Sequence, residues 1–404
     1  IAVQSVNTEN LSAQDVWSMF HSAAFDFSVW EIWGALLFGG RLVIVPHATS
    51  RDPHAFLDLL CEEQVTVLNQ TPSAFQQLSI AEGLEELRNN ALALRTVVFG
   101  GEALEVSTLQ DWWKRHGDQT PQLVNMYGIT ETTVHVTYRP LSQADLATTG
   151  RSLIGGPIPD LTVYLLDPFG ELVPVGVPGE IHVGGHGLAR GYLNRTELTA
   201  ERFISDPFSD TPDARLYRSG DLARWSPNGE LEYLGRADQQ VKVRGFRIEL
   251  GEIEARLAEH PAVALAHVLA RTDASADTQL IAYLTAANAQ QPPTADELRR
   301  HLATALPDYM VPVAFEVLST LPLTANGKLD LKALPEPSLA SRQDRPALVA
   351  PRNDIERAWT AIWREVLEVP EVGVTDSFFD LGGHSLKAVR MVARARQELG
   401  SAVT

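Results

Sequence analysis

Residues 65–78 read Val65-Thr-Val-Leu-Asn-Gln-Thr-Pro-Ser-Ala-Phe-Gln-Gln-Leu78, a short apolar run followed by a helix candidate that begins at a proline. The pattern repeats along the chain, with a helix candidate at 53–63 before this stretch and apolar runs at 95–99 and 123–126 after it. Strands that alternate with helices are typical of α/β layering around a largely parallel sheet. We therefore predict an α/β layered fold from Asp15 to about Leu146.

The pattern changes after this region. From Gly150 to Gly235, short apolar runs alternate with glycine and proline turns, which predicts a β-rich subdomain with hairpins. Helix and strand candidates then alternate up to about Leu334 and indicate a small α+β unit. Four prolines from Pro335 to Pro351 indicate a linker, and two final helix candidates predict part of an all-α bundle. The predicted domain bounds are 1–237, 238–335, 336–350 for the linker, and 351–404.

The composition argues against several classes of protein. The chain has 404 residues, with 33 Lys and Arg against 51 Asp and Glu and a formal net charge of −18. Such an acidic surface repels phosphate backbones and anionic lipids, which disfavours nucleic-acid and membrane-surface roles. The single cysteine, Cys61, excludes an intrachain disulfide and a cysteine metal site, so we expect a reducing, cytoplasmic environment. The longest apolar stretch, 29–45, contains Glu31 and Arg41 and is too polar to cross a membrane. We predict instead a buried helix followed by a strand at 41–45.

Four common site motifs are not found in the sequence. It has no Walker-type phosphate loop and no H-E-x-x-H zinc motif. Gly185, Gly187 and Gly191 miss the dinucleotide-binding spacing by one residue. Gly383-His-Ser385 begins like a hydrolase nucleophile elbow, but Lys387 stands where that motif requires a second glycine.

Five segments combine glycine turns with charged or hydroxylated side chains. They are Asn125–Thr133, Tyr217–Trp225, Gly235–Arg247, Asn326–Asp330 and Phe379–Leu386. In this order they resemble the AMP-forming adenylation domains of non-ribosomal peptide synthetases, followed by a peptidyl carrier domain. The resemblance covers essentially the whole chain. It implies a large α/β adenylation subdomain with a β-rich part, a small α+β subdomain, and a partial all-α carrier bundle.

The resemblance also implies a site for ATP. In that site Tyr127 stacks on the adenine, Asn125 hydrogen-bonds the edge of the base, and Asp221 accepts from the ribose hydroxyls. The other implied residues are Gly128 in the same turn as Tyr127, Tyr233 and Arg236 beside Asp221, Thr130 at the α-phosphate, Glu131 as the Mg²⁺ ligand, and Lys328 between the substrate carboxylate and the phosphate. Mg²⁺ prefers oxygen ligands, and lysine is a compact mobile charge. Two structural alternatives stay open: Tyr127 as a core residue and Glu131 as a helix cap.

Further residues are implied beyond the ATP site. The resemblance makes Asp238 the hinge between the large and small subdomains, and it puts Lys242 and Gly245 in a thiol tunnel. Ser385 becomes the attachment point for 4′-phosphopantetheine. Because the run after Ser385 is helical, the phosphodiester would lie at a helix N-terminus, where free N–H groups and the helix dipole favour an anion. The alternatives are a turn residue at Asp238 and an ordinary helix-cap serine at Ser385.

Ten positions line the amino-acid pocket in this family. Matched segment by segment, they are Asp26, Phe27, Trp30, Asn69, Val98, Gly100, Met126, Val134, His135 and Lys328. Asp26 would pair with the substrate ammonium and Lys328 with its carboxylate, which suits an α-amino acid. Bulky walls leave room for a small side chain, and a buried Asn69 or His135 needs a hydrogen-bond partner. The set resembles the family's threonine-selecting pockets, so L-threonine is the expected substrate. The alternative is that Asn69 and His135 bond each other in an apolar pocket.

One departure from the family concerns the phosphates. The Ser/Thr/Gly-rich loop that grips the β- and γ-phosphates lies upstream of Phe25 in complete enzymes and is not found here. We therefore expect a fragment, cut at Ile1 and Thr404 and inactive in adenylation by itself. In the complete module, ATP, Mg²⁺ and 4′-phosphopantetheine would be the cofactors, and neighbouring condensation and downstream domains and a phosphopantetheinyl transferase the partners. The rival hypotheses are a free-standing acyl- or aryl-CoA ligase, without a carrier serine, and a non-catalytic carrier or interaction module.

Overall fold

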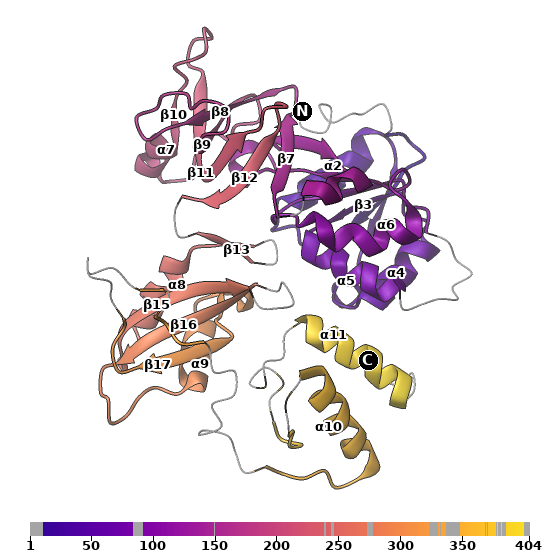
Figure 1. Cartoon of the computed structure of the whole chain (residues 1–404), viewed down its shortest axis with the longest axis vertical. Coiled ribbons are helices and arrows are strands. Elements are labelled where there is room, and N and C mark those ends of the chain that lie inside the picture. Colours follow the sequence, from indigo (N-terminus) through magenta and orange to yellow (C-terminus); the bar gives the residue numbers. More distant parts are fainter. Residues whose placement is uncertain are drawn as a thin grey trace. The chain divides into compact units, whose positions relative to one another are not determined.

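The computed structural model describes residues 11–399, apart from residues 84–91, 149, 238–239, 244–245, 273–277, 323–329, 332, 337–347, 368, 370, 377, 379–380 and 382–384. The chain divides into two compact units, Ile1–Phe246 and Arg247–Thr404 (Figure 1). The long sheet of the first unit and the three-stranded sheet of the second are separate.

The first unit is built on a long mixed sheet, and its first five strands are parallel. They lie in the order β2-β1-β3-β4-β5, and every neighbouring pair in that row runs in the same direction. Their bounds are β1 Val16–Met19, β2 Arg41–Ile44, β3 Val67–Gln70, β4 Thr96–Phe99 and β5 Gln122–Asn125. The predicted α/β layering around a parallel sheet is confirmed.

Alternate side chains of these strands enter two different cores. Leu68, Val97 and Leu123 pack with the helices α4, α5 and α6, whereas their neighbours Val67 and Val98 pack with α2. Successive side chains of a strand point to opposite faces, so a strand that is apolar throughout must be covered on both sides. The helices of this half are α2 Phe27–Leu37, α3 His47–Ser50, α4 Pro53–Glu62, α5 Pro72–Gly83 and α6 Gln110–His116, with the short 3₁₀ helices η2 Val106–Leu109, η3 Thr130–Thr132 and η4 Gln143–Thr148.

Local sequence explains where the helices begin. The carboxylate of Asp52 accepts hydrogen bonds from the backbone N–H groups of His54 and Ala55, and Pro53 occupies the first helical position of α4. Both features stabilise a helix N-terminus, because they satisfy or remove N–H groups that have no partner within the helix. Within the described ranges, no helix is both long and apolar enough to cross a membrane.

The predicted β-rich region continues the same sheet. β5 pairs antiparallel with β6, and β6 pairs antiparallel with β7, so the sheet extends without a break into the region after Gly150. The order beyond β7 is β12-β11-β9-β8, with β10 on β11. The bounds are β6 Thr137–Pro140, β7 Ser152–Pro157, β8 Leu161–Leu166, β9 Gly179–Gly185, α7 Thr196–Arg202, β10 Phe203–Ser205, β11 Arg215–Trp225 and β12 Leu231–Arg236. This part is β-rich, as predicted, but it is hydrogen-bonded to the parallel strands.

The second unit contains a small α+β fold and two further helices. In its sheet β15 pairs antiparallel with β16, and β16 pairs parallel with β17. α9 begins with a capping box, in which the hydroxyl of Thr294 accepts from the N–H of Glu297 and the Glu297 carboxylate accepts from the N–H of Thr294. β13 Val241–Val243 belongs to the first unit, and β14 Phe246–Ile248 begins at its last residue. The bounds of the elements that follow are α8 Leu250–Ala258, β15 Val263–Thr272, β16 Thr278–Ala286, α9 Ala295–Ala303, η5 Asp308–Met310, β17 Ala314–Leu318, α10 Asp354–Leu367 and α11 Ser385–Leu399. The predicted α+β unit and the two final helices are confirmed.

Candidate active site

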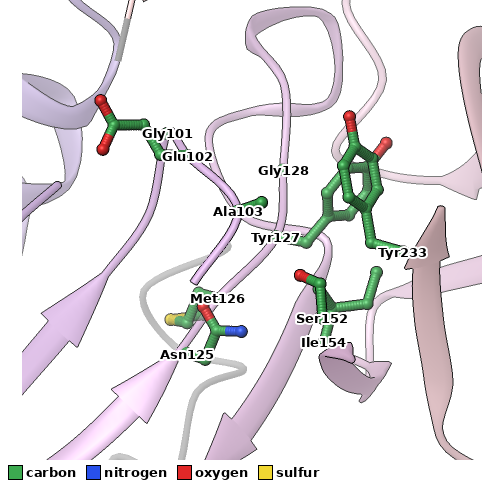
Figure 2. Close-up of a pocket in the computed structure, with 10 residues that line it drawn as sticks. All are labelled: Gly101, Glu102, Ala103, Asn125, Met126, Tyr127, Gly128, Ser152, Ile154 and Tyr233. Carbon is green, nitrogen blue, oxygen red and sulfur yellow. The ribbon is translucent and has the colours of Figure 1, made fainter. Parts of the chain in front are cut away.

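A cavity of about 200 Å³ opens beyond the carboxyl ends of β4 and β5 (Figure 2). In open α/β sheets, this edge of the parallel strands is the usual place for a ligand. The lining comes from the turn after β4, the segment from the end of β5 onward, and the strands β7 and β12. The lining residues are Gly101, Glu102, Ala103, Asn125, Met126, Tyr127, Gly128, Ser152, Ile154 and Tyr233.

Asp221, beside this cavity, is fully buried and is held by three donors. The Tyr127 hydroxyl donates to its Oδ2 over 2.6 Å, the Tyr233 hydroxyl to Oδ1 over 3.3 Å, and the Arg236 guanidinium to Oδ1 over 3.1 Å. The side chains of Asp221 and Arg236 are 0% and 5% exposed, so this ion pair is shielded from water. Four residues predicted for the nucleotide site are therefore brought together.

The hydroxyl of Tyr127 stays protonated. Burial raises its pKa well above the usual value of 10.0, and the negative charge of Asp221 raises it further. The Tyr127 ring belongs to a buried hydrophobic cluster and also lines the cavity. Tyr127 is therefore a core residue, as the structural alternative proposed, and it also contacts the cavity. A protonated phenol donates to the Asp221 carboxylate, which fixes the orientation of that side chain.

A local irregularity of β11 positions Asp221. The pairing of β11 with β9 shifts register between Arg218 and Leu222, and Gly220 in this interval has a φ of +75°. Glycine adopts positive φ without the steric penalty that a Cβ brings. The Ser219 hydroxyl accepts from the N–H of Asp221 over 3.0 Å and donates to the carbonyl of Ile181 over 2.7 Å. The predicted glycine turn before Asp221 is thus a bulge within a strand.

The orientation of Asn125 is set by the backbone of β7. Its carboxamide Nδ2 donates to the carbonyl of Leu153 over 2.9 Å. One amide N–H is engaged in this way, so Asn125 can offer a ligand in the cavity its acceptor oxygen, Oδ1, and one further N–H. A hydrogen-bond acceptor at this place is what the exocyclic amine of an adenine requires.

Gly128 admits no side chain. A Cβ there would lie 1.8 Å from the carbonyl oxygen of Val134. Thr133 and Val134 have φ values of +64° and +70°, which are unusual for β-branched residues. Such strain persists only where the surrounding structure enforces it, and it clusters at binding sites.

Thr130 and Asp26 are joined directly. The Thr130 hydroxyl donates to Oδ2 of Asp26 over 2.6 Å, although the two residues are 104 positions apart. The residue expected at the α-phosphate and the residue expected at the substrate ammonium are therefore neighbours.

Glu131 is held by two phenols. The hydroxyls of Tyr192 and Tyr217 donate to its Oε1 over 2.6 and 2.8 Å. Burial and the bond to Glu131 raise the pKa of Tyr192, so this hydroxyl remains a donor. The carboxylate is thus positioned by tyrosines, whereas the alternative at the sequence level was a helix cap. One fixed carboxylate suits Mg²⁺, which is commonly held by one or two carboxylates together with substrate phosphates and water. Among the described residues, no group of three or more Asp, Glu, His and Cys side chains forms a metal cage.

The predicted amino-acid pocket is also assembled from distant segments. The indole N–H of Trp30 donates to Oδ1 of Asn69 over 2.8 Å, and the His135 ring lies edge-on to Phe27 and Trp30, with centroids 5.3 and 5.1 Å apart. A Cβ on Gly100 would meet Phe27 at 3.2 Å and His135 at 3.6 Å. Val98 and Met126 are buried in the same cluster, with Val134 packed against it.

Two polar side chains of this pocket have unsatisfied atoms. Nδ2 of Asn69 and both ring nitrogens of His135 are buried and find no hydrogen-bond partner in the described part of the chain. The residues are 0% and 2% exposed. The alternative that Asn69 and His135 bond each other is therefore wrong. Burial lowers the pKa of His135 to about 3, so its ring is neutral and offers one donor and one acceptor.

Several expected residues cannot be placed in the site. Lys328, Asp238 and Gly245 lie outside the described residues. For Lys242, within β13, and Ser385, at the first position of α11, only the backbone is described. Conversely, sequence reasoning did not assign roles to Ser152 in the cavity wall or to Tyr192 and Tyr217 at Glu131. Tyr217 is the first residue of the segment Tyr217–Trp225, and its place in that segment was the only indication of a role that the sequence offered.

Family comparison agrees with this geometry. Residues 1–193 match the AMP-binding enzyme family, residues 252–328 match the AMP-binding enzyme C-terminal domain, and residues 360–404 match the phosphopantetheine attachment site. The chain is an adenylation domain followed by a carrier domain. Adenylation domains of this family use ATP with Mg²⁺, and the carrier family holds 4′-phosphopantetheine.

Similar adenylation and carrier domains occur in non-ribosomal peptide synthetases. The chain is 57% identical over 389 residues to the dimodular nonribosomal peptide synthase of Bacillus subtilis (strain 168), with 96% of this chain aligned. It is 44% identical to syringomycin synthase SyrB1 of Pseudomonas syringae pv. syringae, with 95% aligned. A solved NRPS protein with adenylation and PCP domains, holo-PA1221, superposes with a TM-score of 0.77 at 32% identity over 97% of this chain. The chain spans 16%, 62% and 62% of these three proteins, respectively.

Proposed function

We propose that this chain is part of a synthetase module that activates an amino acid with ATP as an aminoacyl adenylate and loads it onto the carrier domain that follows, and that the chain alone does not sustain adenylation. The observation that carries the proposal is the buried Asp221 with its three donors beside a cavity at the ends of β4 and β5. Phe27, Trp30 and His135, which were predicted to line the amino-acid pocket, pack against one another and would form its wall. The match to adenylation domains over most of the chain supports the same reaction.

In the first half-reaction, an oxygen of the substrate carboxylate attacks the α-phosphorus of ATP, and pyrophosphate leaves. The residues of this chain would mainly position the reactants and offset the charge that develops on the phosphoryl group. Asp221 would take the ribose, Asp26 the ammonium and Thr130 an oxygen of the α-phosphate. Glu131 would hold Mg²⁺, which neutralises phosphate charge when bound. Lys328 would contribute a mobile positive charge between the substrate carboxylate and the phosphate.

In the second half-reaction, the acyl group leaves AMP for the carrier. The phosphopantetheine arm on Ser385 supplies the thiol that accepts the acyl group. Asp238 is the proposed hinge for the required rearrangement, and Lys242 and Gly245 are the proposed tunnel residues. Neighbouring synthetase domains and a phosphopantetheinyl transferase are the proposed partners, and the cytoplasm is the proposed location.

The proposed substrate is L-threonine. Its hydroxyl can accept a hydrogen bond from Nδ2 of Asn69 and donate one to the acceptor nitrogen of a neutral His135, which lack other partners among the described residues. Valine has nearly the same shape but leaves these groups unpaired, at a cost of about 1–3 kcal/mol. A site built around a hydroxyl can reject its isostere by as much as about 10⁴–10⁵. Serine lacks only a methyl group relative to threonine, so its kcat/KM should be lower by roughly 10–200-fold.

ATP–pyrophosphate exchange by the parent module tests this specificity. We expect threonine to support the fastest exchange, serine to follow, and valine and 2-aminobutyrate to be poor substrates. The His135→Phe variant should narrow the gap between threonine and valine, because it removes a partner of the hydroxyl. His47→Phe, at an exposed position, is the matched control and should leave the ratio unchanged. Equal rates with valine and threonine would contradict the threonine assignment while leaving adenylation itself intact.

A free-standing CoA ligase fits less well. The match of residues 360–404 to the phosphopantetheine attachment family gives this chain a carrier domain that such a ligase lacks. Finding phosphopantetheine on Ser385 would argue directly against that rival. Pyrophosphate exchange by the parent module would exclude a purely non-catalytic role.

A further inference from the structure

Ser152, the first residue of β7, carries a buried hydroxyl with no assigned task. Its Oγ is inaccessible to solvent and has no hydrogen-bond partner among the residues that the structure describes. Figure 2 shows its side chain among those that line the cavity. In the sheet, Ser152 lies directly opposite Tyr233, which donates to Asp221. A buried polar atom in a native protein usually has a partner, so its absence here calls for a ligand or a water.

The neighbouring groups indicate which ligand atom could satisfy this hydroxyl. The next residue, Leu153, uses its carbonyl to hold Nδ2 of Asn125, which leaves Oδ1 of Asn125 as an acceptor at the same cavity. Ser152 adds a group that can donate beside it. The edge of adenine has the complementary pair, an exocyclic amine that donates next to a ring nitrogen that accepts. Guanine presents a carbonyl oxygen in place of that amine and would face the acceptor of Asn125.

We propose that Ser152 helps to select the base: its hydroxyl donates to a ring nitrogen adjacent to the exocyclic amine of adenine. The inference rests on the proposed function, since it requires the cavity to hold the adenine of ATP. It concerns ground-state recognition of the base, so it predicts a change in nucleotide affinity and none in the affinity for the amino acid.

The test uses AMP as the probe and isothermal titration of the full chain. Ser152→Ala should weaken AMP binding by roughly 3–10-fold, the effect of one neutral hydrogen bond. Ser152→Thr, which keeps the hydroxyl, should restore most of the affinity. Ser18→Ala is the matched control: Ser18 is also a buried strand serine whose Oγ lacks a partner in the described structure, but it does not line the cavity. That variant should bind AMP like the parent.

Base analogues show whether the hydroxyl meets the base itself. We expect either 1-deaza-AMP or 7-deaza-AMP to bind the parent more weakly than AMP, and Ser152→Ala to bind that analogue and AMP equally. If Ser152→Ala weakened the binding of AMP and of both analogues by the same factor, the proposal would be overturned. That result would show that Ser152 acts only through the fold. Unchanged AMP affinity in Ser152→Ala would also overturn it. If the parent chain itself bound no AMP, the proposed function would fail together with this inference, whereas normal binding by the parent separates the two.

Discussion

At the scale of single residues, the buried carboxylate of Asp221 has three hydrogen-bond donors within the protein. Two phenols and a guanidinium occupy the carboxylate. A carboxylate accepts about four hydrogen bonds, so under the proposed function a ribose hydroxyl would join these donors or replace one of them. The sequence motifs indicated Asp221, Tyr233 and Arg236, but no motif indicates that the acceptors are already in use.

Residues missed from the sequence have a common cause. Tyr192 and Tyr217 reach Glu131 from 61 and 86 positions away, and Ser152 faces the cavity because β7 pairs with β12. None of these relations follows from local spacing, because they depend on which strands become neighbours. The family resemblance indicated residues that have a described role in the family, but it did not indicate the residues that hold them in position.

His135 should make the first unit sensitive to acid. Its pKa is about 3 when buried and 6.5 in the unfolded chain, so below pH 6.5 the unfolded state binds a proton that the native state does not. The free energy of unfolding is therefore highest above pH 6.5 and falls as the pH drops toward 3. Between pH 6.5 and 5 this one group should cost roughly 2 kcal/mol. Denaturant unfolding of the parent and of His135→Phe at both pH values measures it.

Comparing how the free energy of unfolding changes with pH in the parent and in His135→Phe separates the effect of His135 from that of other titrating groups. His135→Phe should lose about 2 kcal/mol less than the parent over this pH interval, whatever its absolute stability. His47→Phe, at an exposed position, should follow the parent. Identical pH slopes for the parent and His135→Phe would mean that the imidazole is not buried as described.

At the scale of secondary structure, α2 links the core to the amino-acid pocket. The sequence predicted a buried helix followed by a strand in 29–45, and the structure has α2 at Phe27–Leu37 and β2 at Arg41–Ile44. α2 carries Phe27 and Trp30, and it packs on β1 through the fully buried ring of Trp17. The position of the pocket wall thus depends on the fit between one helix and one strand.

Gly34→Ala should disturb that fit. A Cβ at Gly34 would lie 2.3–2.9 Å from ring carbons of Trp17, and this ring is fully buried. Overpacking of this kind costs roughly 1–3 kcal/mol, so we expect a lower unfolding midpoint and weaker amino-acid binding. Gly251→Ala in α8 is the control, because a Cβ there meets nothing within 4 Å. That variant should be neutral or more stable by up to about 1 kcal/mol. Equal effects of the two substitutions would contradict the packing argument.

Strand order is the part of the fold that sequence patterns could not provide. Apolar runs and proline-led helices located most elements of the parallel half, because caps and apolar periodicity are local signals. The β-rich region was predicted as a subdomain with hairpins, and the structure shows that β6 and β7 join it to β5 in one hydrogen-bonded row. Such pairing is decided by contacts between distant segments, which the pattern within one strand does not encode.

At the scale of the whole chain, the proposed functions are distributed between two units. The described contacts of the nucleotide cavity all come from residues up to Arg236, within the first unit. Lys328 and Ser385 belong by sequence to the second unit, which starts at Arg247. Substitutions in one unit should therefore separate nucleotide binding from the later chemical steps.

Lys328→Ala should separate binding from adenylation. In the parent module we expect pyrophosphate exchange to fall on the order of 10²–10³-fold, the usual effect of losing one contact to developing charge. AMP affinity should stay the same, since the described contacts of the cavity lie in the first unit. Lys332→Ala removes a lysine four positions away and should keep normal exchange. A similar loss in both variants would mean that the general positive charge of this segment matters and that Lys328 has no special role.

Ser385→Ala should separate adenylation from loading. The Ser385 hydroxyl is the proposed nucleophile toward coenzyme A: it takes the phosphopantetheinyl phosphate, gives up its proton, and releases adenosine 3′,5′-bisphosphate. Because α11 begins at Ser385, the new phosphodiester would lie at the N-terminus of a 15-residue helix, where unpaired N–H groups favour negative charge.

With a phosphopantetheinyl transferase and coenzyme A, the parent and Ser401→Ala should gain the mass of one phosphopantetheine, and Ser385→Ala should gain none. Pyrophosphate exchange by the Ser385→Ala parent module should remain normal, because its first unit is unchanged. Modification of Ser385→Ala would place the attachment point elsewhere, and a loss of exchange in that variant would show that the two half-reactions cannot be separated at this serine.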